Sequence, residues 1–146
     1  MDVKRLQYGS PLWKTVTQYA MNCSWKAGPS LARLMRDGGF SGWESVFAMI
    51  CGDDIAGFCT LAKKDCIPNV EYTPYIGYVF VGEAFRGQRI SQRMICCALE
   101  YAKSIGFSKV YLVSGEQGLY EKYGFVKLEE RADTWGRLEQ IFYILT

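Results

Sequence analysis

Residues 85–91, FRGQRIS, place two arginines around a glycine where an apolar run (76–81) gives way to a helical pattern. The first N–H groups of a helix lack partners inside the helix, and together with the helix dipole they attract anions. Arg86 and Arg89 add positive charge, and Gly87 lets the backbone approach a ligand closely. The segment predicts a phosphate or pyrophosphate site over residues 86–91, although a solvated basic turn would have the same residue types.

Other kinds of site are excluded by missing residues. The chain contains neither a Walker loop, G-x-x-x-x-G-K-[ST], nor the Rossmann pattern G-x-G-x-x-G. It has no histidine, which excludes Ser-His, Cys-His and His-ligated metal mechanisms. The six cysteines form no C-x-x-C pair. We therefore expect no metal site, and we expect the thiols to be reduced and mostly buried.

Length and composition indicate one globular domain over residues 1–146, with 49% apolar residues. The net charge of +2 is too small for a nucleic-acid surface spread over one face. The N-terminus has no apolar segment typical of a signal peptide, and no apolar run is long enough for a membrane helix. We expect a cytoplasmic protein with neither a nucleic-acid nor a membrane partner.

The phosphate-binding segment lies within an α/β (α+β) pattern of helices and strands. Because buried strands alternate with helices and hairpins, we expect one mixed sheet of about six to seven strands with helices on both faces. Helices are predicted at 11–22, from 29 to about 37, from 90 to about 105, and within 117–124. Strands are predicted at 45–51, 55–62, 75–81, 109–114, 125–130 and 137–145.

Two segments resemble the acetyl-CoA core of the GNAT superfamily of N-acetyltransferases. In YVFVGEAFRGQRISQRMICCALEYAKSIGF, Arg86 occupies the first position of that family's [QR]-x-x-G-x-[GA] pattern. Arg89 replaces the usual glycine and Ser91 replaces the final small residue. In KVYLVSGEQGLYEKYGF, the family's Y-x-x-x-G-F pattern is complete as Tyr120, Gly124 and Phe125. The resemblance, which extends to the order of elements over nearly the whole chain, implies a single GNAT domain with a splayed central sheet.

The resemblance also implies where acetyl-CoA, the cosubstrate, binds. Backbone groups of Val79, Phe80 and Val81 would pair with the pantetheine arm as if it were an added strand. The backbone amides that would hold the pyrophosphate belong to Arg86, Gly87, Gln88, Arg89, Ile90 and Ser91. Arg89 either tunes or impairs this site, because arginine is much larger than glycine.

The implied reaction is acetyl transfer to a primary amine by direct attack on the thioester. An alkylammonium has a pKa of ~10.4, so a group must accept its proton before it can attack. Tyr120 is the residue that the resemblance makes the proton donor to the departing thiolate. The proton acceptor is left open among Glu71, Glu116 and ordered water.

We expect the acceptor between the early helices and the late hairpin, and we expect it to be a small-molecule amine. One alternative is a protein or peptide N-acetyltransferase, and another is a non-catalytic CoA-binding sensor module. A homodimer is compatible with the family. Residues of two kinds are candidates for the lining: the aromatic Trp25, Trp43, Tyr72, Tyr75 and Trp135, and the acidic Glu44, Asp65, Glu71 and Asp133.

Overall fold

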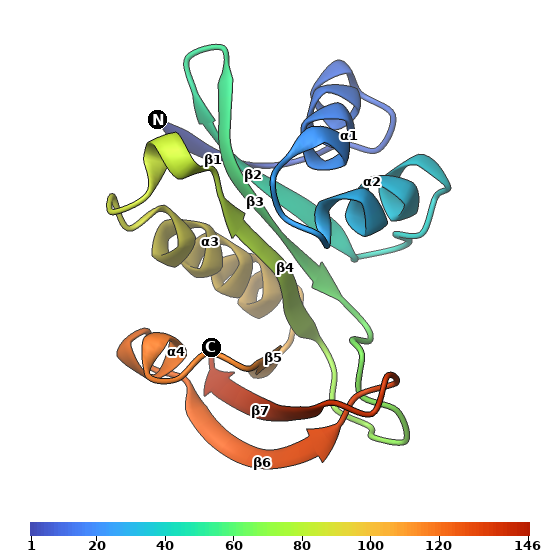
Figure 1. Ribbon diagram of the computed structural model, residues 1–146, viewed down its shortest axis with the longest axis vertical. Coiled ribbons are helices and arrows are strands. Elements are labelled where there is room, and N and C mark those ends of the chain that lie inside the picture. The colour runs from blue at the N-terminus through green and yellow to red at the C-terminus, as the bar shows by residue number, and fades with distance from the viewer.

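One seven-stranded sheet in the order β1-β2-β3-β4-β5-β7-β6 runs through the computed structural model, which describes residues 1–146 (Figure 1). The β4–β5 pair is parallel, and every other neighbouring pair is antiparallel. The predicted mixed sheet is therefore confirmed. The strands are β1 (Asp2–Arg5), β2 (Ser45–Cys51), β3 (Asp54–Ala62), β4 (Tyr75–Val81), β5 (Lys109–Ser114), β6 (Val126–Ala132) and β7 (Leu138–Leu145).

Helices cover both faces of the sheet, as predicted (Figure 1). On one face, α1 (Pro11–Asn22) and α2 (Gly28–Arg36) enclose an apolar core with β2 and β3. On the other face, α3 (Ile90–Ser104) encloses a second core, to which α4 (Leu119–Lys122) contributes Tyr120. None of these helices combines the length and the apolar character needed to cross a membrane.

Several boundaries follow from local sequence signals. The Ser10 hydroxyl oxygen accepts a hydrogen bond from the Trp13 N–H at 3.2 Å, and Pro11 begins α1, as predicted. β5 has its predicted bounds. Neither β1 nor the short 3₁₀ turn η1 (Glu83–Phe85) was predicted from the sequence. β1 is a four-residue edge strand of mostly polar residues, so it shows neither an apolar run nor a clear alternation.

The cysteines are free thiols, but the prediction that most are buried is wrong. Cys59 is buried, Cys96 is exposed, and the other four are partly exposed. Adjacent helical residues differ in direction by about 100°. α3 therefore turns Cys97 toward the core and leaves Cys96 in solvent.

The sheet opens at β4. On its β3 side β4 pairs from Tyr75 to Val81, but on its β5 side only Tyr75 and Ile76 pair. A bulge interrupts the β3–β4 register, and within it Tyr78 adopts a φ of +48°. Bulges bend a strand and increase its twist, so β4 diverges from β5 beyond Ile76. This confirms the splayed sheet that the family resemblance implied.

Candidate active site

Residues 86–89 form the turn between η1 and α3, and residues 90 and 91 begin α3. Gly87 and Arg89 have left-handed backbone conformations, with φ of +83° and +60°, which direct the chain into α3 at Ile90. No backbone carbonyl accepts a hydrogen bond from the N–H groups of residues 87–92, whereas the Arg93 N–H donates to the Arg89 carbonyl at 3.1 Å. This array of unpaired donors at a helix N-terminus suits a phosphate group.

The Arg86 side chain folds back on the end of β4. Its Nε donates to the Val81 carbonyl at 3.0 Å, and its Nη2 lies 3.4 Å from Oε1 of Glu83. Its guanidinium carbon is 5.8 Å from the centre of the Phe80 ring. The Arg86 N–H donates weakly to the Glu83 carbonyl at 3.5 Å. These contacts hold η1 against β4, so Arg86 shapes the turn, and its contact with an anion stays a prediction.

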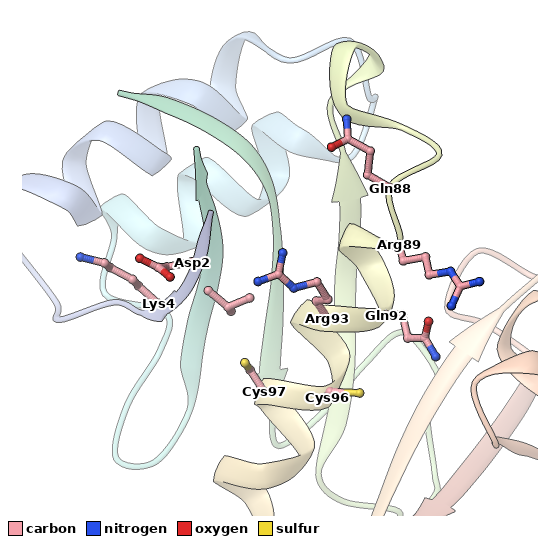
Figure 2. A pocket seen from close by; sticks show the side chains of 9 residues that line it. Asp2, Lys4, Gln88, Arg89, Gln92, Arg93, Cys96 and Cys97 are labelled. Carbon is pink, nitrogen blue, oxygen red and sulfur yellow. The ribbon is translucent and has the colours of Figure 1, made fainter. Parts of the chain in front are cut away.

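A pocket of about 700 Å³ lies beside the start of α3. In Figure 2 the Arg93 side chain extends from α3 toward β1, while the Arg89 side chain leaves the helix in the opposite direction. Nη2 of Arg93 donates to the Met1 carbonyl at 3.0 Å. Arginines thus flank the start of α3 on two sides. The pocket is lined by Asp2, Val3, Lys4, Gln88, Arg89, Gln92, Arg93, Cys96 and Cys97.

The first turn of α3 is fixed to its surroundings by two neighbouring residues. Ile90 is buried in the core beneath the helix. The Ser91 hydroxyl lies 2.7 Å from the Tyr123 hydroxyl, which follows α4. The unpaired amides of residues 87–92 are therefore held in place from below and from the side.

The β5-facing edge of β4 is open at Val79, Phe80 and Val81. On the opposite edge, Phe80 pairs with Phe58 and Val81 pairs with Gly57. The Val81 carbonyl also accepts the hydrogen bond from Arg86, so part of its bonding capacity is used. A ligand that carries amides can bind such an edge as an added strand.

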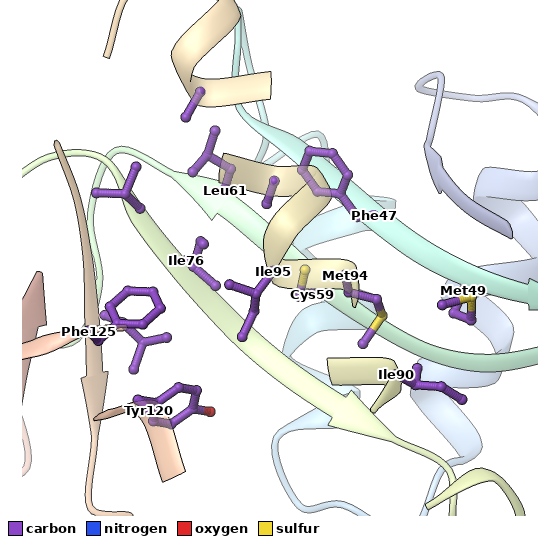
Figure 3. Close-up of a cluster of buried hydrophobic side chains, with 14 of the residues drawn as sticks. Phe47, Met49, Cys59, Leu61, Ile76, Ile90, Met94, Ile95, Tyr120 and Phe125 are labelled. Carbon is purple, nitrogen blue, oxygen red and sulfur yellow. The ribbon is translucent and has the colours of Figure 1, made fainter. Parts of the chain in front are cut away.

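Tyr120 lies in α4 at the edge of the core beneath α3 (Figure 3). Its ring packs against Tyr123, Phe125 and Phe142, with ring centres 6.0, 6.1 and 6.2 Å away. Burial, and after it the negative charge of Glu116, raise the pKa of Tyr120 to about 12. The phenol is therefore protonated at neutral pH and is a possible proton donor.

The remaining members of Y-x-x-x-G-F hold Tyr120 in place. Gly124 follows α4 with a φ of +98°, a conformation that glycine adopts without strain. The Phe125 side chain is buried, and its N–H donates to the Tyr120 carbonyl at 3.1 Å. The pattern is thus a helix end that fixes the position of one phenol.

The tryptophans predicted to line an acceptor site do not lie together. Trp25 stacks on Phe80, with ring centres 5.8 Å apart, and belongs to the core under α1 and α2. Trp43 packs on Phe107 at 4.8 Å, in the core on the other face. Trp135 is 76% exposed in the β6–β7 turn. These separate positions contradict a single cluster, because the three tryptophans lie in three different connections, between α1 and α2, before β2, and between β6 and β7.

Tyr72 and Tyr75, the two tyrosines predicted to line the acceptor site, do come together, around Tyr111, which was not predicted. Tyr72 stacks on Tyr111 of β5 at 4.8 Å, and Tyr75 of β4 packs on the same ring at 5.9 Å. This tyrosine group lies where β4 and β5 still pair, next to the point at which they separate.

The predicted acidic residues have different roles. Glu44 accepts hydrogen bonds from the N–H groups of Ser41 and Lys63, at 3.2 and 2.9 Å. Asp133 caps the β6–β7 turn by accepting from the N–H groups of Trp135 and Arg137, both at 2.9 Å. Both carboxylates therefore stabilise turns.

Asp65 is the acidic residue placed at the opening of the sheet. Its Oδ2 is 3.0 Å from the position that a Cβ on Gly77 would occupy. Glu71 and Glu116 are exposed, and a role for either as proton acceptor stays a prediction. Tyr123 was not predicted either, because nothing in a predicted helix marks one polar residue as closer to the site than another.

Comparisons with known proteins agree with this geometry. A model of the acetyltransferase (GNAT) family matches residues 13–125. A GNAT-family acetyltransferase structure from Desulfovibrio desulfuricans is 13% identical, with a TM-score of 0.75 over 99% of this chain and 98% of that chain. Aminoglycoside 6'-acetyltransferase type Ii is 17% identical, with a TM-score of 0.76 over 99% and 97%.

A variant of a spermidine N-acetyltransferase from Vibrio cholerae is 16% identical, with a TM-score of 0.68 over 99% of this chain and 92% of that chain. No curated protein shows significant sequence similarity to this chain. At these identities the solved structures establish the fold, while the family match establishes the family.

The left-handed conformation of Arg89 generates a prediction about stability. A non-glycine residue in this conformation destabilises the fold by about 1–2 kcal/mol. Glycine removes this strain, but it loses more conformational entropy on folding, so part of the gain in stability is lost. We expect Arg89→Gly to raise the free energy of unfolding by up to about 1 kcal/mol. The matched control, Arg93→Gly, lies inside α3 and should lower it by about 1 kcal/mol. Urea unfolding measures both, and a loss of stability in Arg89→Gly would contradict the strain.

Proposed function

This chain belongs to the acetyltransferase (GNAT) family, and we propose that it transfers the acetyl group of acetyl-CoA to a primary amine of a small molecule. The observation that carries this proposal is the juxtaposition of two sets of backbone groups. The unpaired N–H groups of residues 87–92 lie at the end of the strand whose β5-facing edge is open after Ile76.

The two sets of groups fit the two parts of acetyl-CoA. Its pyrophosphate is an anion that suits the helix N-terminus. Its pantetheine arm is extended and carries amides, so it suits the open edge of β4 at Val79, Phe80 and Val81. Arg89 adds positive charge at the loop. The thioester would then reach the opening between β4 and β5.

The chemistry follows from this placement. The neutral amine nitrogen attacks the thioester carbon, a C–N bond forms, and the C–S bond breaks. The departing sulfur takes the Tyr120 proton, and the nitrogen, which keeps one hydrogen in the amide, releases one proton to a carboxylate or to water. Tyr120 then regains a proton from solvent, which restores the phenol. A phenol suits this role because it remains protonated at neutral pH while the alkylthiolate is basic.

The acceptor is the less constrained part of the proposal. Solved structures of this fold include proteins named as acetyltransferases of aminoglycosides and of spermidine, which are small polycationic amines. Tyrosines and Asp65 at the opening favour a compact cationic group over a long peptide. A protein acetyltransferase and a CoA-binding sensor without turnover are the competing functions.

Acetyl-CoA should raise the melting temperature by several degrees at a concentration about 100 times its Kd, because it binds the folded state. ATP and NAD at equal concentration should raise it less, since neither carries an amide-bearing arm to pair with β4. Thermal unfolding measures the shifts. Thiol release in the presence of polyamines, aminoglycosides, amino acids and lysine peptides then identifies the acceptor class. Equal shifts from all three nucleotides would indicate a general anion site and oppose the proposal.

Tyr120→Phe should remove the proton donor while keeping the packing of the ring. We expect kcat to fall by a factor on the order of 10² to 10⁴, the usual range for a positioned general acid. The Kd of acetyl-CoA should change little, because the lost interaction forms mainly in the transition state. Steady-state thiol release and calorimetry measure the two quantities. Tyr101→Phe, which changes a phenol near the far end of α3 and keeps the ring that contacts Arg5, is the matched control. Unchanged kcat in Tyr120→Phe would remove Tyr120 from the mechanism.

A further inference from the structure

Glu83 begins η1, just after β4, and its carboxylate joins two distant parts of the chain. Its Oε1 accepts a hydrogen bond from the Ser24 hydroxyl and lies 3.4 Å from Nη2 of Arg86. Ser24 belongs to the connection between α1 and α2, whereas Arg86 begins the 86–89 turn, which leads into α3. One carboxylate thus links the helices that flank the expected acceptor site to the turn at the expected phosphate site.

The end of β4 packs against the same two helices. Trp25, in the α1–α2 connection, stacks on Phe80 with ring centres 5.8 Å apart. The Tyr19 hydroxyl of α1 is 2.7 Å from the position that a Cβ on Gly82 would occupy, so a larger residue there would displace it. Contact between the helices and β4 therefore continues up to Gly82, and the Glu83 carboxylate extends it to the 86–89 turn.

The 86–89 turn depends on side chains for its position. The Arg86 N–H donates weakly to the Glu83 carbonyl at 3.5 Å, and the next N–H that donates to a backbone carbonyl is that of Arg93. The Arg86 side chain anchors the start of the turn, with Nε on the Val81 carbonyl at 3.0 Å and Nη2 beside Glu83. How Arg86 is held therefore affects where the unpaired N–H groups of residues 87–92 point.

The charge of Glu83 by itself would oppose a phosphate group. A carboxylate near an anion site repels the anion, and here the ion pair with Arg86 offsets that repulsion. The side chains of Arg86 and Glu83 are 57% and 63% exposed. An ion pair this exposed contributes little to folding stability, which leaves the geometry of the turn as the property that it can affect.

We propose that Glu83 is a positioning residue for acetyl-CoA: its carboxylate holds Arg86 and Ser24 together and so fixes the 86–89 turn relative to the α1–α2 connection. This rests on the proposed function and deepens it, because it connects the cofactor site with the helices that flank the expected acceptor site. Cofactor affinity then depends on Ser24, although the side-chain hydrogen bond of Ser24 is to Glu83 and not to the turn itself.

Calorimetric titration of CoA tests this role, because CoA carries the pyrophosphate of acetyl-CoA but no acetyl group to transfer. Glu83→Ala removes both contacts of the carboxylate. It should raise the Kd of CoA roughly 3- to 10-fold, the range expected for an exposed hydrogen bond to a charged group. Repulsion between the carboxylate and the phosphates predicts the opposite sign, so an unchanged or lower Kd in Glu83→Ala overturns the proposal.

Ser24→Ala tests the link to the α1–α2 connection. Alone it should raise the Kd of CoA about 2- to 5-fold. In a Glu83→Ala background it should have no further effect, because the partner of its hydroxyl is gone. Residues of one network show such non-additivity, whereas independent effects on the fold add. Wild-type affinity in Ser24→Ala, or additive effects in the double variant, would overturn the link.

Glu83→Gln separates the hydrogen bonds from the charge. Its amide oxygen can still accept from Ser24 and Arg86, so the Kd of CoA should stay within about twofold of the wild-type value. A Kd as high as that of Glu83→Ala would overturn the role of these hydrogen bonds. The matched control is Glu100→Ala, which removes an exposed carboxylate from a later turn of α3 and should leave the Kd unchanged. An equal rise in Glu100→Ala and Glu83→Ala would overturn the proposal.

The positioning role and the proposed function fail in different ways. Acetylation of a small amine by the wild type, with a wild-type Kd of CoA in Glu83→Ala, would retain the acetyltransferase function and overturn the positioning role. Weaker CoA binding in Glu83→Ala and in Ser24→Ala, without acetylation of any amine by the wild type, would retain the positioning role and overturn the proposed function.

Discussion

The opening between β4 and β5 after Ile76 is the constraint on which the rest of the structure depends. Unpaired backbone groups destabilise a sheet unless another partner satisfies them. Here β3 holds the far edge of β4 up to Val81, and β7 holds the far edge of β5 from Lys109 to Ser114. Both strands are therefore fixed while the edge between them stays available to an extended ligand.

Backbone strain lies at the two ends of this open edge. Tyr78 and Arg89 have positive φ without being glycine, and each such residue costs of order 1–3 kcal/mol. The Tyr78 ring packs on Trp25, and its hydroxyl lies 2.9 Å from that of Ser30, so α2 holds the bulge in place. Arg89 is confined between Gly87 and α3. The surrounding contacts hold both strained conformations, which bend β4 away from β5 and direct the loop amides outward.

The sequence predicted what depends on local signals. α1, β5 and α3 have the expected starts, since caps, apolar periodicity and terminal glycines act within a few residues. The side chains that meet across elements were predicted less well. Trp25 and Trp43 pack in opposite cores, and because both lie in loops, no strand or helix periodicity indicates which core each one joins. Asp65 was in the predicted acidic group, but the sequence did not distinguish it from Glu44 and Asp133, which stabilise turns.

The two polar groups proposed for the reaction approach the opening from opposite faces of the sheet. Tyr120 belongs to the core under α3, where burial keeps its proton bound. Asp65 is an exposed residue whose carboxylate lies over Gly77 on the other face. With β4 between them, the acid and the carboxylate cannot exchange a proton directly. In the proposed reaction the acceptor's amine and the sulfur of acetyl-CoA would therefore meet protein groups from different faces of the sheet, and the gap between β4 and β5 is what brings the two substrates together.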